Sequence, residues 1–425
     1  MPFRRGARPA RRADPTRFAS HESEKRVKVA TVRFAEVLNI DDLRTLARRR
    51  VPALVFAYID GGAEDEVTLR ANRSAFTDVT FRPRQCEAVS ACDLRTQVLG
   101  TTLDLPFLLA PVGFCRMFHP RGEVHAAREA NAAGTSYILS TFSGTRLEEV
   151  RQAAAGPLWY QLYVPGGRDV AERAIARARA AGYAALVVTI DTPVAGMRER
   201  DLRYGVRPLL NGDFWRSVPH AWQFLARPRW TLDYLADGAP RVFPNVELPG
   251  HGPMPCGDVS ALLERTLITW TDLRWIRDAW QGPIVVKGVH TGEAARRAID
   301  AGADAVVVSN HGGRQLDGVA ASLRTLPEVV AAVDGRIEVL MDGGIRRGSD
   351  IAKALCLGAR AVLIGRAYAF GLAAAGGPGV ARAIDILRTD LVRTLRLLGC
   401  PSTSALDRSY VDVPSAWTSG LSSSG

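Results

Sequence analysis

Residues 309–318, SNHGGRQLDG, bring a histidine, an arginine, an aspartate and three glycines into ten positions. His311 is a candidate general base, because an unperturbed imidazole titrates near neutral pH. Arg314 is a candidate ligand for a carboxylate, which a guanidinium group binds through two hydrogen bonds. Together, these two residue types indicate proton transfer on an anionic substrate.

A second stretch, TIDTPVAGMRER at residues 189–200, supplies partners for this chemistry. Asp191 is a candidate carboxylate that stabilises the imidazolium formed when His311 takes a proton. Arg198 is a second candidate for binding the substrate carboxylate, and Tyr163 in QLYV has a hydroxyl that can bond a substrate oxygen. A base and a carboxylate clamp, combined with a redox cofactor, indicate oxidation of an α-hydroxy acid.

Glycines and arginines near the end of the chain indicate a phosphate site. They occur in DGGIRRGSD from Asp342 and in IGRA from Ile364, with Arg346, Arg347 and Arg366 as candidate ligands. Neither a G-x-G-x-x-G after a strand nor a G-x-x-x-x-G-K-[ST] is present, which argues against NAD and ATP. FMN and PLP remain. Lys287, inside the apolar run IVVKG, would form a Schiff base with PLP or lie beside the ring of FMN.

These residues follow short apolar runs that alternate with Ala/Arg-rich helical segments. Such runs are typical of parallel strands that are buried on both faces. The eight runs are LPFLLAPVG from Leu105, SYILSTFS from Ser136, LWYQLYV from Leu158, ALVVTIDTP from Ala185, PIVVKGV from Pro283, AVVVSNHGG from Ala305, IEVLMDGG from Ile337 and AVLIGRAY from Ala361. Eight units predict an α/β fold of the TIM (β/α)8 barrel type, with a doubly wound sheet as the alternative. In such a barrel the chemistry lies at the carboxyl ends of the strands.

The spacing of the runs predicts the domain organisation. Residues 34–412 form one domain, with the barrel at about 105–400 and an insertion at about 201–268, after the fourth strand. Residues 34–104 are predicted to be helical, and NIDDLRTLARRR opens on an Asn/Asp cap. Residues 1–33 and 413–425 are predicted to be a basic, disordered tail and a flexible tail.

Composition narrows the class of protein. The net charge is +11, of which residues 1–33 carry +7, so the rest of the chain is not basic enough to indicate nucleic-acid binding. The six cysteines include no C-x-x-C pair, which argues against a metal site and for reduced thiols in an intracellular protein. No apolar run is long enough for a transmembrane helix, and no apolar run follows the N-terminal arginines as in a secretory signal.

Taken together, these motifs resemble those of the FMN-dependent α-hydroxy acid oxidase/dehydrogenase family. The matching stretches run in family order from about residue 35 to 412. They are AYIDGGAEDEVTLRAN, APVGF, HPRGE, QLYV, TIDTPVAGMRERD, VVKGVHT, SNHGGRQLDG, DGGIRRGSDIAKALCLGARAVLIGRAY and RLLGC. The resemblance implies FMN as the cofactor and a small 2-hydroxy acid as the substrate.

The resemblance also implies roles for individual residues. His311 corresponds to the catalytic base and Asp191 to its partner, and the base takes a proton from either the hydroxyl group or the α-carbon. Arg198 and Arg314 correspond to the carboxylate ligands, and Tyr58 and Tyr163 to the two substrate tyrosines. The residues implied in FMN binding are Pro111, Val112, Gly113, Ser140, Gln161, Thr189, Lys287, Asp342, Gly344, Arg346, Gly365 and Arg366. Among these, Lys287 is expected near the N1/C2 carbonyl side of the ring and Asp342 on the ribityl chain.

Three departures from the family pattern bear on the substrate and the acceptor. Phe142 stands where several relatives carry tryptophan, and Ala195 is smaller than the residue of the glycolate-type oxidases, which favours lactate or a larger acid. Gly113 stands where oxidases more often carry alanine. It favours a dehydrogenase that passes electrons to a quinone, a cytochrome or another acceptor over an enzyme that uses oxygen.

The insertion bears on the location of the protein. DFWRSVPHAWQFLARPRWTLDYL, from Asp213, interleaves tryptophan, phenylalanine and arginine, as at a membrane interface. A lid over the site or a subunit contact explains the same composition. We therefore expect a cytoplasmic homo-oligomer, with peripheral membrane contact through 201–268 as one interpretation. A peptide-modifying relative of the family and a non-redox phosphate-binding lyase remain alternative functions.

Overall fold

The computed structural model describes residues 36–206, 208 and 218–417. The chain divides into two compact units, residues 1–38 and 39–425, and all elements named below belong to the second unit. The predicted basic tail at 1–33 lies outside the described residues, as do residues 418–425 of the predicted flexible tail.

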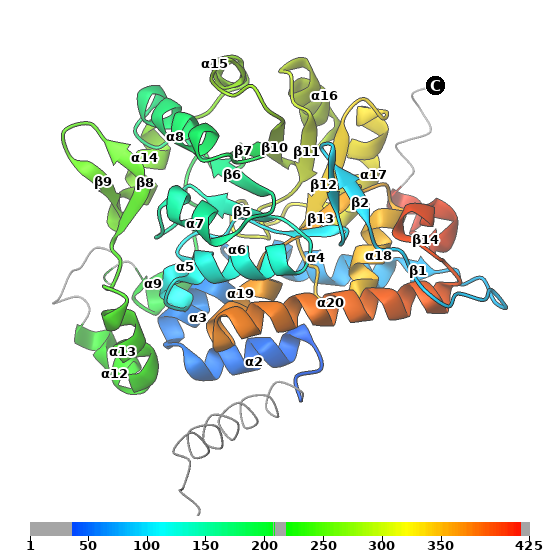
Figure 1. Ribbon diagram of the computed structural model, residues 1–425, viewed down its shortest axis with the longest axis horizontal. Coiled ribbons are helices and arrows are strands. Elements are labelled where there is room, and N and C mark those ends of the chain that lie inside the picture. Colours follow the sequence, from blue (N-terminus) through cyan, green and yellow to red (C-terminus); the bar gives the residue numbers. More distant parts are fainter. Residues whose placement is uncertain (1–35, 207, 209–217, 418–425) are drawn as a thin grey trace, which may run out of the picture. The chain divides into compact units, whose positions relative to one another are not determined.

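Eight parallel strands close into a barrel, in the order β10-β11-β12-β13-β4-β5-β6-β7 (Figure 1). They are β4 (Phe107–Leu109), β5 (Tyr137–Ser140), β6 (Leu158–Leu162), β7 (Ala185–Thr189), β10 (Ile284–Val289), β11 (Ala305–Val308), β12 (Glu338–Asp342) and β13 (Ala361–Ile364). Each lies in one of the eight predicted runs. Closure confirms the (β/α)8 prediction and excludes the doubly wound alternative. Apolar side chains such as Leu108, Val285 and Leu340 fill the inside and are fully buried.

Helices alternate with these strands along the chain. They are α5 (Cys115–Phe118), α6 (Gly122–Ala132), α7 (Leu147–Ala153), α8 (Arg168–Ala180), α15 (Asp272–Ala279), α16 (Gly292–Asp300), α17 (Ser322–Val333), α18 (Gly348–Cys356), α19 (Arg366–Ala375) and α20 (Gly377–Leu398). Their buried positions are mostly alanine, valine and leucine, which lets the helices pack closely on the strands.

The segment before the barrel is helical only in its first half. It comprises α2 (Ile40–Arg50), α3 (Ala53–Asp60), α4 (Val67–Asp78), β1 (Thr80–Phe81), β2 (Thr96–Val98) and β3 (Thr101–Leu103). Asn39 caps α2 through a reciprocal capping box with Asp42, as the sequence predicts. The prediction of helix up to residue 104 is wrong for residues 80–103, where β2 and β3 pair as a short hairpin. Helix α2 packs against α19 and α20 (Figure 1).

The predicted insertion lies between β7 and α15. Its elements are α9 (Glu199–Arg203), η1 (Val218–His220), α12 (Ala221–Leu225), α13 (Pro228–Ala236), β8 (Val242–Leu248), β9 (Gly252–Pro255), η2 (Cys256–Asp258) and α14 (Val259–Arg265). Strands β8 and β9 form an antiparallel hairpin, and Phe243 of β8 packs on Phe114 and Phe142. The insertion therefore contributes to the wall at the carboxyl ends of the strands.

The chain ends beyond the barrel in short elements: η3 (Thr403–Ala405), η4 (Arg408–Tyr410), β14 (Val411–Asp412) and η5 (Ser415–Trp417). β14 pairs with β1 and so joins the two ends of the second unit. All six cysteines are free thiols, as predicted. No helix within the described ranges is both long enough and apolar enough to cross a membrane.

Candidate active site

The carboxyl ends of the strands open onto a cavity of about 590 Å³. Every residue that the sequence predicted for the site lines this cavity except Arg347 and Asp191, and Asp191 lies behind His311. The strand register aligns the ends of neighbouring strands at the cavity, since Lys287 of β10 is paired with Thr189 of β7 and with Val307 of β11. The structure thus brings together residues that lie up to 308 positions apart in the chain, from Tyr58 to Arg366.

His311 and Asp191 form a hydrogen-bonded pair. Nδ1 of His311 lies 2.9 Å from Oδ1 of Asp191, and the backbone N–H of His311 donates to Oγ of Ser309. Burial raises the pKa of Asp191, but the charge and hydrogen bond of His311 outweigh it and lower that pKa. The carboxylate is therefore ionised at neutral pH and able to stabilise a protonated imidazole.

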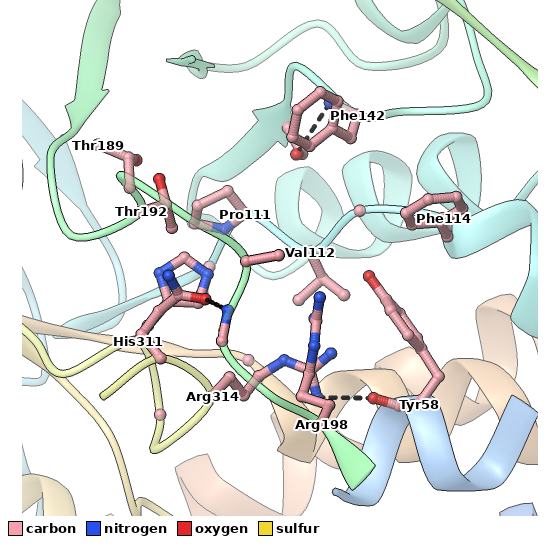
Figure 2. Close-up of a pocket in the computed structure, with 18 of the residues that line it drawn as sticks. Tyr58, Pro111, Val112, Phe114, Phe142, Thr189, Thr192, Arg198, His311 and Arg314 are labelled. Carbon is pink, nitrogen blue, oxygen red and sulfur yellow. Dashed lines mark hydrogen bonds between the residues drawn. The ribbon is translucent and has the colours of Figure 1, made fainter. Parts of the chain in front are cut away.

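Arg198 and Arg314 approach the same aromatic ring. The guanidinium of Arg314 lies 4.8 Å from the centre of the Tyr58 ring, and that of Arg198 lies 6.0 Å from it. Figure 2 shows both arginines between His311 and Tyr58. Arg314 is fixed by hydrogen bonds from Nη1 to the carbonyls of Tyr58 and Gly61, at 2.7 and 2.9 Å.

Burial and the neighbouring charge of Arg198 lower the pKa of Arg314. Two positive charges held this close create a favourable position for a substrate carboxylate, which would neutralise both of them.

Two tyrosines complete this side of the cavity. Burial raises the pKa of Tyr58 and of Tyr163, so both hydroxyls stay protonated and can donate at neutral pH. The Tyr163 ring stacks on Phe142, with 4.9 Å between ring centres. Both predicted tyrosines therefore line the cavity as potential hydrogen-bond donors.

Lys287 lies at the floor of the cavity and is almost completely buried. Its Nζ is 2.9 Å from Oδ2 of Asp342 and donates to Oγ of Ser309 at 3.0 Å. Burial lowers the pKa of Lys287, but Asp342 and Asp191 outweigh it and raise that pKa. Lys287 thus carries a positive charge. Only one Asp342 oxygen is engaged, because Oδ1 has no partner among the described residues.

Beside Lys287, a polar edge follows β5, β6 and β7. Oγ of Ser140 donates to Oε1 of Gln161 at 3.1 Å, and both Gln161 and Thr189 line the cavity. Nε2 of Gln161 and Oγ1 of Thr189 are buried without hydrogen-bond partners in the described part of the chain. Buried polar groups usually have a partner, so these two atoms are available to a ligand or an ordered water.

The three predicted phosphate arginines differ in their surroundings. Arg366 uses its donors on the carbonyls of Ile59, Gly61 and Gly312, at 3.1, 2.7 and 2.8 Å. Burial, together with Arg314 and Arg346, lowers the pKa of Arg366 strongly.

Arg346 donates from Nη1 to the Ile345 carbonyl, while its Nε has no partner within the described residues. Burial lowers the pKa of Arg346 to about 10. Arg346 is thus the better-placed donor for an anion. Arg347, the third candidate from the sequence, is exposed and does not line the cavity.

The glycines of this region have different roles. Gly365 precedes α19, and a Cβ at this position would make ordinary van der Waals contact with Ala110, 3.8 Å away. The backbone N–H groups at the start of α19 are candidate donors to an anion. A Cβ on Gly344 would lie 1.9 Å from the carbonyl oxygen of Asn72, so Gly344 is required for close packing on α4.

These groups fit FMN. The unpartnered atoms of Gln161, Thr189 and Asp342 offer hydrogen bonds to a flat ring and a polyol chain, and Arg346 offers one to a phosphate. The apolar residues Pro111 and Val112 line the same cavity. No cluster that could hold a metal ion is found among the described residues.

Sequence reasoning missed several residues that support the site. Ser309 accepts hydrogen bonds from both Lys287 and His311, and Asn310 is bonded to Asn72 of α4 at 2.8 Å. Both lie in the motif that contains His311, but their partners come from remote segments. Val206, Cys256 and Leu263 of the insertion also line the cavity, and no sequence pattern identified them.

Comparisons with known proteins agree with this site. A family model described as FMN-dependent dehydrogenase matches residues 47–413. An L-lactate dehydrogenase of Caulobacter sp. (strain K31) is 43% identical over 373 residues, covering 87% of this chain and 97% of that protein. An L-lactate dehydrogenase of Caulobacter vibrioides (strain NA1000 / CB15N) is 44% identical over 385 residues, covering 88% and 97%.

A comparison with solved structures agrees with these matches. The crystal structure of the monotopic membrane protein (S)-mandelate dehydrogenase superposes with a TM-score of 0.83 at 38% identity, covering 89% of this chain and all of that one.

Proposed function

The chain belongs to the family of FMN-dependent dehydrogenases, and from this premise we propose that it oxidises an L-2-hydroxy acid to the 2-oxo acid. The relatives named L-lactate dehydrogenase and (S)-mandelate dehydrogenase support a substrate of this class, with lactate as the reference acid. Membership of the family removes the PLP-dependent and lyase alternatives.

One observation carries the proposal: His311, which is hydrogen-bonded to Asp191, lines the same cavity as the two arginines. Arg198 and Arg314 bind the substrate carboxylate and so fix the position of the adjacent C2 carbon. Nδ1 of His311 is engaged by Asp191, which leaves Nε2 to take the substrate proton. Asp191 then stabilises the imidazolium, and Tyr58 and Tyr163 donate to substrate oxygens.

FMN, when bound, takes up the two electrons of this oxidation. We assign its ring to the surface formed by Pro111, Val112 and Gly113, with Ser140, Gln161 and Thr189 at its polar edge. Lys287 supplies a positive charge there, and Asp342 bonds the ribityl chain through its free oxygen. Gly344, Arg346, Gly365 and Arg366 surround the phosphate, with Arg346 making the direct contact.

We further propose that the electrons leave to a quinone or another acceptor in preference to oxygen. Gly113 is the supporting residue, since a Cβ there would lie 3.2 Å from the carbonyl oxygen and 3.3 Å from Cβ of Phe142. An alanine, as in many oxidases, would need Phe142 to move. The measurement is the rate at which reduced enzyme is reoxidised by air and by a soluble quinone.

Exposed apolar side chains of the insertion support the proposal that the protein contacts a membrane peripherally. On α12 and α13 the side chains of Trp222, Leu225, Leu232 and Leu235 are 60%, 80%, 67% and 60% exposed. Leucine and tryptophan at this exposure are expected where a helix lies on lipid. Trp230 is an exception to the predicted interface, because it is buried and donates to the carbonyl of Met117. Trp215 lies outside the described residues.

The test of the main proposal is reduction of the bound flavin without oxygen. The holoenzyme is mixed anaerobically with L- and D-lactate, L- and D-mandelate and L-2-hydroxyisocaproate, and the flavin absorbance is followed. We expect bleaching by L-acids only. Bleaching by none would reject the proposal and favour a peptide-modifying relative. Rapid reoxidation by air would favour an oxidase. A homo-oligomer stays a prediction for the same preparation.

A further inference from the structure

The side chain of Gln315 lies between the two loops that carry the charged groups of the site. Its Nε2 donates to the carbonyls of Asp191 and Val194, at 3.1 and 2.8 Å. Its Oε1 accepts from the backbone N–H of Gly196 at 3.2 Å. One amide group on the loop of His311 and Arg314 therefore bonds three backbone groups on the loop of Asp191 and Arg198.

The barrel itself does not join these loops. They follow β7 and β11, and β10 lies between these two strands. No ladder hydrogen bond connects β7 directly to β11, so the distance between the loops depends on contacts outside the sheet. Residues 190–198 form no helix or strand, and their backbone needs partners of another kind.

The two loops touch closely at Gly196. A Cβ at this position would lie 2.3 Å from the carbonyl oxygen of Arg314 and 2.8 Å from Cα of Gln315. Such an approach is possible only for glycine. The contact has to be maintained against the repulsion between Arg198 and Arg314, whose like charges meet over the Tyr58 ring.

We infer that Gln315 is a positioning residue that holds Asp191 and Arg198 in register with His311 and Arg314. The inference rests on the proposed function, since it assigns Gln315 a part in the proposed oxidation. Gln315 lines the cavity, but the hydrogen bonds of its side chain go to backbone groups of the other loop and not to the side chains of His311 or Asp191. It acts by fixing the backbone from which Asp191 reaches His311, at 2.9 Å, and from which Arg198 reaches the substrate.

Two substitutions of Gln315 distinguish the hydrogen bond that its side chain accepts from the two that it donates. Gln315→Leu removes all three at nearly constant size. Gln315→Glu keeps the acceptor for the Gly196 amide but, when ionised, turns an oxygen towards the carbonyls of Asp191 and Val194. Gln281→Leu is the matched control, because Gln281 is exposed at the end of α15 and its Nε2 bonds only the Asp278 carbonyl.

We expect both variants of Gln315 to retain FMN and to lose about 10- to 100-fold in kcat/KM for flavin reduction, because a small displacement of reacting groups has a cost of this order. The pH profile of flavin reduction shifts in both variants, because the hydrogen-bonded pair in which His311 lowers the pKa of Asp191 is loosened. The carbonyls of Asp191 and Val194 should raise the pKa of the new carboxyl in Gln315→Glu above its ordinary value of about 4.3. As the pH falls towards that pKa, the carboxyl gains a proton and becomes a donor, so the activity of Gln315→Glu rises relative to Gln315→Leu.

Hydrogen exchange provides a readout that does not depend on activity. The amide of Gly196 loses protection in Gln315→Leu and keeps it in Gln315→Glu. Gln281→Leu matches the wild type in every measurement.

Three results would overturn the inference. The first is that Gln315→Leu reduces its flavin with wild-type kinetics. The second is that both variants turn over more slowly, but with the wild-type pH profile and with a ratio of Gln315→Glu to Gln315→Leu activity that does not change with pH. The third is failure of both variants to fold or bind FMN, which would make Gln315 a residue required for folding. If no 2-hydroxy acid reduces the wild type, the proposed function fails. The exchange at Gly196 then decides separately whether the loops are joined as inferred.

Discussion

Among the single residues of the site, Asp191 is the clearest case of a side chain that contacts another site residue, His311, and not the cavity itself. It does not line the cavity, and its free oxygen, Oδ2, has no partner among the described residues. Asp191 packs directly against Gly288 of β10. A side chain at position 288 would not fit, since its Cβ would lie 2.7 Å from Cβ of Asp191. This position agrees with the proposed role of Asp191, which is to orient His311 and to stabilise its protonated form.

Asp191→Asn tests this role. The amide keeps the size of the side chain but removes the charge that stabilises the imidazolium, so flavin reduction should slow by about 100-fold. FMN content should stay unchanged. Asp300→Asn, at an exposed position at the end of α16, is the control. A reduction rate within twofold of the wild type would show that the pair is not part of the chemistry.

The Lys287–Asp342 pair gives a second prediction. Lys287→Met leaves a buried carboxylate without its cation and should lower the free energy of unfolding by about 3–5 kcal/mol. Adding Asp342→Asn removes that charge and should recover much of the loss. Urea unfolding of the single and double variants measures both effects. If the single and the double variant lost the same free energy of unfolding, the unpaired charge of Asp342 would not be the cause of the loss.

At the scale of elements, α3 connects the site to its surroundings. Tyr58 lies on its cavity side, and Asp60 at its end bonds Arg44 of α2 and Arg200 of α9. Burial raises the pKa of Asp60, but the bonds with Arg44 and Arg200 outweigh it and lower that pKa. The ionised carboxylate thus ties three helices together next to the active site.

Asp60→Asn should lower the free energy of unfolding at pH 7 by about 1–3 kcal/mol, since it removes charged hydrogen bonds. The folded pKa of Asp60 is depressed, so its contribution is complete above the unfolded value of about 3.9 and is lost as the pH falls below it. The difference between wild type and variant should therefore shrink on acidification through pH 4. A difference that stays constant with pH would contradict this assignment.

The helices α12 and α13 carry three exposed leucines of the insertion, Leu225, Leu232 and Leu235. Leu225→Glu combined with Leu232→Glu should release the protein from vesicles containing anionic lipid, because it places charges in the apolar layer. Co-sedimentation measures the bound fraction. Leu397→Glu, at a residue that is 72% exposed on α20, controls for the added charge. Wild-type binding of the double variant would assign these leucines to another contact.

For the whole molecule, the sequence predicted the arrangement of the barrel well because buried parallel strands have an unbroken apolar pattern. The eight runs, the insertion after the fourth strand and the Asn39 cap all depend on local chemistry of this kind. The short hairpin of β2 and β3 was missed because its strands have three residues each.

Long-range pairing within the site could not be predicted in the same way. The sequence does not reveal that Lys287 is paired with Asp342, that Gly344 packs on Asn72, or that Arg366 bonds three carbonyls. Each of these contacts joins segments far apart in the chain, and side-chain direction there depends on the completed barrel.

The most direct test of the central claim compares wild type with His311→Gln as FMN-loaded proteins in an anaerobic stopped-flow experiment. Glutamine can still accept the hydrogen bonds of a substrate but cannot take its proton at neutral pH. The account predicts rapid bleaching of the wild-type flavin by an L-2-hydroxy acid, and a rate lower by about 100- to 10,000-fold in the variant at unchanged FMN content. Reduction of His311→Gln at the wild-type rate would contradict it.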